Sequence, residues 1–396
     1  MKVHPYDIKS PVLLKKDQIV NNSQLLFQSR FAHFQSALLK AVSLNWPEFQ
    51  TIQSGFRISS PSSPGHSTNN VASEQVLIGL VVAKFPNRVK AITKYTGILD
   101  ESVQGSAIEN LDEPVLYLKS EHFTVLLKRN VQSLVPGVVV ALKGTMNTAE
   151  ECFDVDSSLY PNQVEITEVA EQQSVQNAKL FVQAGIEHLK HYAALNQFLQ
   201  LNKFESLVIS SPFIDPISTT TGKSQLDNFK YSRAETFLDI QFDYEQTDQM
   251  LFQLSQNAVQ TVVSPGLSSP VNRSYPQQQI PKLLELSSVS GVQFAQNPFF
   301  FDFYGKKCCL ISGIFNDIQV ILQSGLIIPG LGVTVDFYAE NETFNYLEGI
   351  QVLVLCGTKK NEILDAKVNG ETVRIICVQE LSGFAMNEHL EVTFEL

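Results

Sequence analysis

The residues best placed to do chemistry lie in one loop that follows a short apolar strand. Residues 262–264 run into Pro265-Gly266, which is the pattern of a buried strand ending in a sharp turn. Sites of open α/β sheets form at the carboxyl ends of such strands. Asn272 stands in this loop, and an asparagine joined by a histidine and an acid could hold two metal ions for phosphate-ester hydrolysis. Neither a histidine nor an acid stands beside Asn272, so the loop has the position of a site without its reactive groups.

The other strand ends that a two-metal site would use are also short of ligands. Such a site holds two cations about 3.5–4 Å apart with carboxylates and histidines from several strands. The first strand is followed by Gln183-Ala184-Gly185 without an acid, and after the second strand Asp215 comes too late. At the last strand end, where such a site needs a histidine ligand, the sequence is Cys356-Gly357-Thr358 and contains no histidine. The sequence therefore predicts a chain with no catalytic residues, no metal ligands and no cofactor.

The composition favours an intracellular chain of more than one domain. Its 396 residues are enough for two or three domains. The five cysteines are odd in number and form no Cys-x-x-Cys pair, which indicates free thiols in a reducing compartment. The start of the chain has no apolar signal core, and no run reaches the roughly 20 apolar residues of a membrane span. The net charge of −11 argues against a surface that itself grips a phosphate backbone.

The first part of the chain is predicted to be a helical segment followed by a linker. Residues 1–20 read as irregular, and a helix capped by Asn22 or Ser23 carries apolar residues three and four apart up to Val42. One face of this helix must pack on something. We expect residues 1–57 to dock on the domain at the other end of the chain, and residues 58–70, rich in Ser and Pro, to form a linker.

Residues 71–170 read as a small β-barrel domain. Short apolar strands alternate with turn signals from Gln75 to Val169, and Gly79 inside the first strand indicates a bulge or a barrel bend. This spacing suits an OB-fold. OB-folds often bind single-stranded nucleic acid, but residues 71–169 carry a net charge of −5. A barrel that binds protein or serves structure is the better reading, and a single-strand binder stays as an alternative.

Residues 175–396 read as an α/β region followed by a β-rich one. Strands are predicted at 179–183, 206–210 and 260–263, with helices at 186–201 and 246–254 between them. Later strands are predicted at 292–294, 299–303, 307–314, 351–356, 366–368, 374–380 and 388–394. Asn369-Gly370 predicts a type I′ hairpin turn. This order suits the two-sheet αββα sandwich of calcineurin-like phosphoesterases, so the predicted fold class is mixed α+β, an OB-fold barrel followed by that sandwich.

Several short motifs resemble the small (B) subunit family of DNA polymerases, in particular that of polymerase delta. The most specific is the loop with Pro270-x-Asn272 and Pro276-Gln277-Gln278, shortly after Ser-Pro-Gly. Asn297-Pro298, Ser312-Gly313 and Cys356-Gly357-Thr358 follow in the family's order. The resemblance implies an OB-fold joined to a phosphoesterase-like domain that has lost catalysis. It gives Pro270, Asn272, Pro276, Gln277 and Gln278 a structural or interface role.

The resemblance also implies a partner set. The chain would be a nuclear, non-catalytic scaffold that binds the C-terminal cysteine-rich domain of the polymerase catalytic subunit and bridges it to a third accessory subunit. It would contact the sliding clamp and primer-template DNA only indirectly, and it would not bind a membrane. Ser269 replaces the family's acid, and the histidine after the Gln pair is absent. The alternatives are therefore the equivalent subunit of polymerase alpha or epsilon, a phosphoesterase with atypical metal ligands, and an OB-fold single-strand binder.

Overall fold

The computed structural model describes most of the chain in two compact units. The described residues are 1–4, 16–49, 57–59, 74–84, 115–120, 123–168, 179–186, 189–202, 204–211, 244–266, 277, 279, 291–313, 317–328, 345–379, 382–386 and 391–395. The sandwich unit comprises Met1–Ser10, Val164–Ile318 and Leu347–Leu396, and the barrel unit comprises Pro11–Gln163 and Gln319–Tyr346. Both contain strands and helices, which confirms the mixed α+β class.

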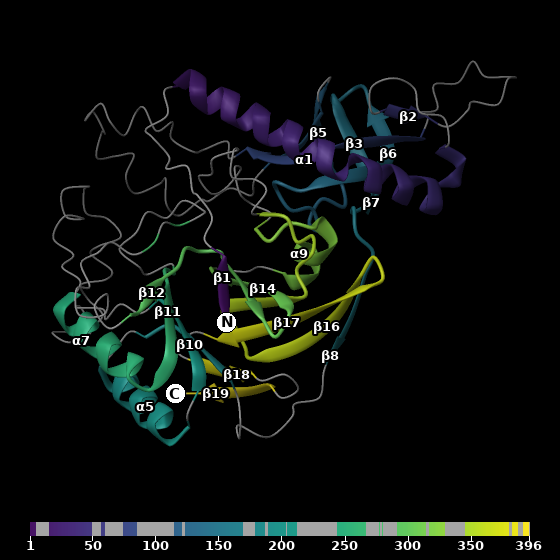
Figure 1. Cartoon of the computed structure of the whole chain (residues 1–396). Helices are drawn as coiled ribbons and strands as arrows, with labels where there is room; N and C mark the ends of the chain where they lie inside the picture. The colour runs from purple at the N-terminus through teal and green to yellow at the C-terminus, as the bar shows by residue number, and fades with distance from the viewer. Residues whose placement is uncertain are drawn as a thin grey trace, which may run out of the picture. The chain divides into compact units, whose positions relative to one another are not determined.

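One sheet of the sandwich unit is built on parallel strands. Its order is β12-β11-β10-β9-β18-β19, and β9 to β12 run parallel. Helices α5 and α7 pack on it, with their side chains in one core beside those of the strands (Figure 1). The elements are β9 (Leu180–Ala184), α5 (Leu189–Leu201), β10 (Phe204–Ser210), α7 (Tyr244–Ser255), β11 (Ala258–Ser264), β12 (Gln293–Phe294), β18 (Ser382–Met386) and β19 (Glu391–Glu395). The predicted strand-helix alternation is confirmed.

The second sheet of this unit has seven strands in the order β1-β13-β14-β15-β17-β16-β8. Its centre, β14-β15-β17, is parallel, and the flanking pairs are antiparallel. The strands are β1 (Lys2–His4), β8 (Val164–Glu168), β13 (Phe299–Phe303), β14 (Lys306–Ser312), β15 (Val352–Thr358), β16 (Glu362–Val368) and β17 (Glu371–Gln379). At the β16–β17 turn Asn369 and Gly370 have φ of 52° and 90°, which confirms the hairpin that Asn-Gly predicts.

Side-chain alternation divides the apolar residues of this unit between two cores. Val182 and Val208 of the first sheet meet Leu310 and Val354 of the second in the core between the sheets. Their neighbours along the strands, such as Phe181, point the other way and pack with α5 and α7, because successive side chains of a strand face opposite sides. The described residues of this unit thus form three layers, the two packed sheets and one layer of helices.

The barrel unit contains a sheet that closes on itself. Its order is β2-β3-β4-β5-β7-β6, and a further pairing of β3 with β6 closes five of these strands into a ring. Only β5 and β7 pair in parallel within it. The interior is apolar and includes Leu118, Leu127 and Phe153. The strands are β2 (Arg57–Ser59), β3 (Glu74–Lys84), β4 (Val115–Lys119), β5 (Thr124–Lys128), β6 (Val139–Asn147) and β7 (Cys152–Leu159).

Gly79 of β3 marks a close approach of two strands. The β3–β6 register runs through Gly79 without a shift, so the predicted bulge is absent at this pairing. A Cβ at this position would lie 2.7 Å from the backbone oxygen of Lys119. Glycine is therefore required because the backbone of the neighbouring strand β4 approaches too closely for a side chain.

The N-terminal helix α1 packs on the barrel. It runs from Lys16 to Asn45, earlier than the predicted cap, and η1 (Pro47–Phe49) follows. Its apolar face, including Phe31 and Leu38, shares a core with strands β3 and β6 (Figure 1). The prediction that residues 1–57 dock on the phosphoesterase-like domain is therefore wrong for this helix, because an apolar stripe does not specify its partner. Strand β1 of the same range does pair with β13 of the sandwich unit. None of the described helices is long and apolar enough to span a membrane.

Three further segments lie elsewhere than predicted. Strand β8, predicted to belong to the barrel of residues 71–170, pairs with β16 of the sandwich unit. Residues 319–346, predicted within the domain 175–396, belong to the barrel unit with most of α9 (Ile318–Ser324). Strand β1 falls in the stretch predicted to be irregular. The placement of each of these segments depends on pairing with residues far along the chain. A local sequence pattern does not predict such pairing. Residues 58 and 59 are in β2, and the rest of the linker 58–70 lies outside the described residues.

Candidate functional site

The ends of the parallel strands bring polar side chains to one edge of the sandwich unit. Ser210 at the end of β10 lies opposite Ser264 at the end of β11. Ser312 ends β14 of the other sheet, opposite Cys356 of β15. The hydroxyl groups of Ser210 and Ser312 form a hydrogen bond. This edge, which the sequence predicts to have the position of a site without its reactive groups, is therefore where polar groups link the two sheets.

Asn297 is the centre of these contacts. Its side chain is fully buried, and Nδ2 donates to Gln277 Oε1 at 2.7 Å and to the carbonyl oxygen of Ser312 at 2.8 Å. Its Oδ1 accepts from the backbone N–H of Ser312 at 3.0 Å. Backbone hydrogen bonds of 2.7 and 3.2 Å also join Asn297 and Gln277 in both directions. We call Ser210, Ser264, Gln277, Asn297 and Ser312 the strand-end cluster.

Two further polar side chains lie at the same strand ends. Ser264 Oγ donates to the carbonyl oxygen of Gln296 at 2.9 Å. Gln183, at the end of β9, is fully buried, and its Nε2 lies 3.3 Å from the carbonyl oxygen of Gly185. Its Oε1 has no hydrogen-bond partner among the described residues. An unpaired buried acceptor costs about 1–3 kcal/mol, so Gln183 is a local weak point beside an otherwise well-bonded cluster.

The strand-end cluster consists of amides and hydroxyls, which are uncharged at neutral pH. Such groups are suited to hydrogen bonding with one another, whereas hard cations favour sites that include carboxylates. Burial raises the pKa of the adjacent Cys356 thiol to about 12, although its hydrogen bond with Ser312 acts in the opposite direction. This thiol is protonated at neutral pH and is a poor nucleophile. Within the described ranges, no three His, Cys, Asp or Glu side chains gather closely enough to hold a metal ion.

The structure describes one of the five residues singled out from the sequence. Gln277 is 1% exposed and belongs to the strand-end cluster. Pro270, Asn272, Pro276 and Gln278 lie outside the described residues, so their predicted role stays a prediction. The sequence reasoning missed Asn297 as a site residue. Its only local signal is the Asn297-Pro298 pair before an aromatic strand, and its partners are 15 and 20 residues away.

Comparison with known proteins assigns no relative. No protein-family model matches the chain, and no curated protein matches it.

Close packing at the strand ends gives a prediction for Gly266, which follows β11. A Cβ at this position would lie 2.0 Å from Ser211 Oγ and 2.8 Å from Ser211 Cβ. We expect Gly266→Ala to lower the free energy of unfolding by about 2 kcal/mol in urea denaturation, because the added methyl group overfills the site. Ser211 itself has a φ of 55°, which glycine adopts at little cost. The Ser211→Gly, Gly266→Ala double variant should therefore recover most of the loss. A double variant as unstable as Gly266→Ala alone would contradict this packing.

Proposed function

We propose that this chain is a non-catalytic accessory subunit of a replicative DNA polymerase, of the delta type. The observation that carries the proposal is the strand-end cluster. At the edge where a two-metal phosphoesterase would hold its ions, amides and hydroxyls are hydrogen-bonded to one another. Gln277, from the motif with the most specific resemblance, is one of them. Gln277 of this motif thus has a structural role that needs no catalysis.

The architecture of each unit also supports the proposal. The closed order β3-β4-β5-β7-β6, with its single parallel pair β5–β7, agrees with a five-stranded Greek-key barrel of the OB type. Two packed sheets, one of them covered by α5 and α7, agree with a phosphoesterase-like sandwich. An OB barrel with an inactive phosphoesterase-like domain is the architecture that the B-subunit resemblance implies.

The proposed role is assembly. The chain binds the C-terminal cysteine-rich domain of the catalytic subunit and bridges it to a third accessory subunit in the nucleus. The sliding clamp and primer-template DNA are reached mainly through those partners, in keeping with the net charge of −11. The equivalent subunit of polymerase alpha or epsilon is the alternative within the same class.

Affinity purification of the tagged full-length chain from its native cells tests this role. We expect a large polypeptide to co-purify at a one-to-one ratio and the eluate to extend a primed template. The sequence of that polypeptide distinguishes delta from alpha and epsilon. An eluate without a polymerase polypeptide and without primer extension would overturn the proposal.

An assay for the competing enzyme uses the purified chain alone. With manganese and a chromogenic phosphodiester, the wild-type chain and Asn272→Ala should both show no turnover above buffer. Turnover by the wild-type chain that is lost in Asn272→Ala would identify a phosphoesterase with atypical ligands instead.

A further inference from the structure

Strand β8 forms one edge of the seven-stranded sheet of the sandwich unit. It pairs with β16 on one side, and no described strand pairs with its other side, which we call the free edge. Four of its five residues, 165 to 168, are exposed, and Ile166 is 38% exposed. An edge of this kind carries backbone N–H and C=O groups to which another strand can bond.

The β16–β17 hairpin fixes which backbone groups of β16 point toward β8. Val368 and Glu371 flank its two-residue turn, and the residues that flank such a turn are hydrogen-bonded to each other. Hydrogen-bonded pairs alternate along an antiparallel ladder, and the register of β16 with β17 runs without a shift. The N–H and C=O groups of Asp365 and Lys367 therefore point away from β17, toward β8.

The same alternation divides the backbone groups of β8. Glu165 lies opposite Lys367, and Thr167 lies opposite Asp365, so these two residues of β8 exchange hydrogen bonds with β16. The N–H and C=O groups of residues 164, 166 and 168 point to the free edge instead. A strand placed there would find donors and acceptors at alternate positions.

The side chains of β8 select the kind of strand that fits. Glu165 and Glu168 lie on opposite faces of the strand, and both are exposed. Lys367 lies opposite Glu165, yet neither glutamate forms an ion pair among the described residues. Ile166 shares its face with the buried Ala366 opposite it and extends that apolar surface to the edge. A strand with basic side chains and an apolar residue beside Ile166 would complement this edge.

The free edge lacks most of the features that keep strands from pairing. Strand β8 contains no proline and no lysine, and its register with β16 has no bulge. Proline, lysine and bulges are common means of blocking an edge. The two glutamates remain. They repel an acidic strand or a second copy of β8, whereas they attract lysine and arginine, so the edge is selective and not blocked.

We propose that the free edge of β8 binds an extended segment of a partner protein, rich in Lys or Arg, which adds to the sheet as a further strand. Main-chain hydrogen bonds supply the affinity, and alternate side chains supply the specificity. Basic side chains meet Glu165 and Glu168, and an apolar side chain packs beside Ile166. The net charge of −11 favours the encounter with such a segment. The inference does not rest on the polymerase assignment.

A labelled peptide of about seven residues that alternates Lys and Val is the probe. We expect it to bind the full-length chain in fluorescence anisotropy, and to bind more weakly at higher salt. Two further versions are N-methylated, one at the valines and one at the lysines. One of them should lose binding and the other should keep it, because only alternate residues of an added strand bond to β8.

Hydrogen exchange and variants of β8 give further readouts. The bound peptide should slow the exchange of the amides of Ile166 and Glu168 and leave those of Glu165 and Thr167 unchanged, because the latter already bond to β16. Ile166→Pro removes an outward donor and no bond to β16, so it should weaken binding about tenfold and keep the urea midpoint of wild type. The Glu165→Gln, Glu168→Gln double variant should weaken binding about fivefold.

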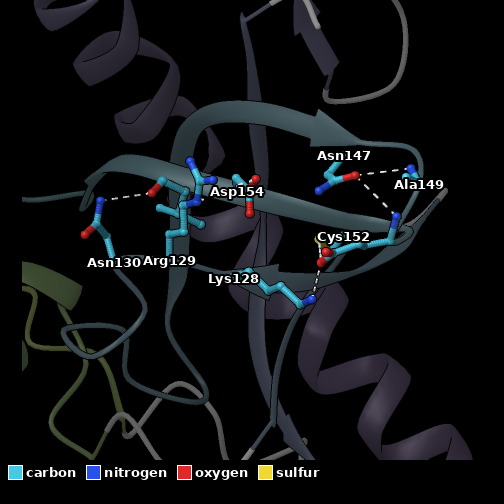
Figure 2. A network of polar contacts seen from close by, with 9 residues as sticks. Lys128, Arg129, Asn130, Asn147, Ala149, Cys152 and Asp154 are labelled. Carbon is cyan, nitrogen blue, oxygen red and sulfur yellow. Dashed lines mark hydrogen bonds and ion pairs between the residues drawn. The ribbon is translucent and has the colours of Figure 1, made fainter.

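The matched control for the charge change lies in the barrel unit. Glu150 and Glu151 are exposed in the β6–β7 turn, where Lys128 bonds to Glu150 and Asn147 Oδ1 accepts from the backbone N–H of Ala149 (Figure 2). The Glu150→Gln, Glu151→Gln double variant loses the same formal charge as the double variant of β8. Its affinity for the peptide should stay within about twofold of wild type.

Several results would overturn the proposal. These are no binding of the Lys-Val peptide by the wild-type chain, equal losses in the control and in the β8 variants, and the same outcome for both N-methylated peptides. Equal binding of a peptide that alternates Glu and Val would overturn the basic partner. Dimerisation of the chain alone that Ile166→Pro abolishes would also overturn the proposal and assign the free edge to a second copy.

Discussion

Asn297→Ala is expected to lower the free energy of unfolding by about 3–4 kcal/mol. The substitution removes three side-chain hydrogen bonds, of 2.7, 2.8 and 3.0 Å, from a side chain with no exposed surface. Each buried group left without its partner costs about 1–3 kcal/mol. Because Asn297 joins Gln277 to Ser312, its loss should loosen the edge where the two sheets meet. Urea denaturation, with hydrogen exchange to locate the effect, measures both.

The matched control for this variant is Asn202→Ala, in the same unit. The Nδ2 of Asn202 donates one hydrogen bond of 3.0 Å to the carbonyl oxygen of Phe198, and the side chain is partly exposed. Water can replace that bond, so the loss should be below about 1 kcal/mol. Equal effects of the two substitutions would show that the strand-end cluster does not stabilise the fold.

Asn297→Asp separates hydrogen bonding from charge. The introduced carboxylate would face Gln277 Oε1 and the carbonyl oxygen of Ser312, both of which now accept hydrogen bonds from the amide. Burial and these acceptors disfavour the charged form and raise the pKa of an introduced carboxyl group. The destabilisation is then smallest below about pH 4, the unfolded value for Asp, and grows as the pH rises to the folded pKa. A variant equally stable at pH 4 and pH 7 relative to wild type would contradict a buried, acceptor-rich environment.

The local sequence predicts those parts of the fold whose signals are local. Strands β9, β10 and β11 are runs of apolar residues with helix-like periodicity between them, and Asn369-Gly370 can adopt the backbone angles that a tight hairpin needs. The edge of the sheet that carries the candidate site follows from this alternation, since parallel strands end together. These features could be predicted from the sequence because each depends on residues that are close together in the chain.

The contacts that were missed join distant residues. Strand β8 reads as one more short strand after the barrel, yet its partner β16 begins almost 200 residues later. The apolar stripe of α1 indicates burial but does not distinguish one apolar surface from another. In the sequence, Asn297 looks like any polar residue before a proline. Only the fold places Gln277 and Ser312 within hydrogen-bonding distance of its side-chain amide. The sequence pattern thus identifies which residues must be buried, whereas the tertiary fold decides which surface they pack against.

Gly144→Ala is expected to destabilise the barrel unit more than any other substitution that adds a single methyl group there. Gly144 lies where the β6–β7 register shifts by one residue. A Cβ here would be 2.0 Å from the backbone oxygen of Asp154 and 3.0 Å from a ring carbon of Phe153. A backbone oxygen in a strand cannot rotate away, so β7 must move and its hydrogen bonds to β6 and β5 must weaken. We expect a loss of at least about 3 kcal/mol, at the upper end of overpacking costs, measured by urea denaturation.

The control for Gly144→Ala separates this clash from backbone strain. Gly305 has a φ of 76° and open space where a Cβ would stand, so Gly305→Ala adds only the cost of a left-handed alanine, about 1 kcal/mol. Hydrogen exchange should show faster exchange of β6 and β7 amides in Gly144→Ala and normal exchange there in Gly305→Ala. No side-chain change can relieve a clash with a backbone atom, whereas Ser211→Gly relieves the one at Gly266. A loss for Gly144→Ala no larger than for Gly305→Ala would mean that β6 and β7 do not approach as closely as the register shift requires.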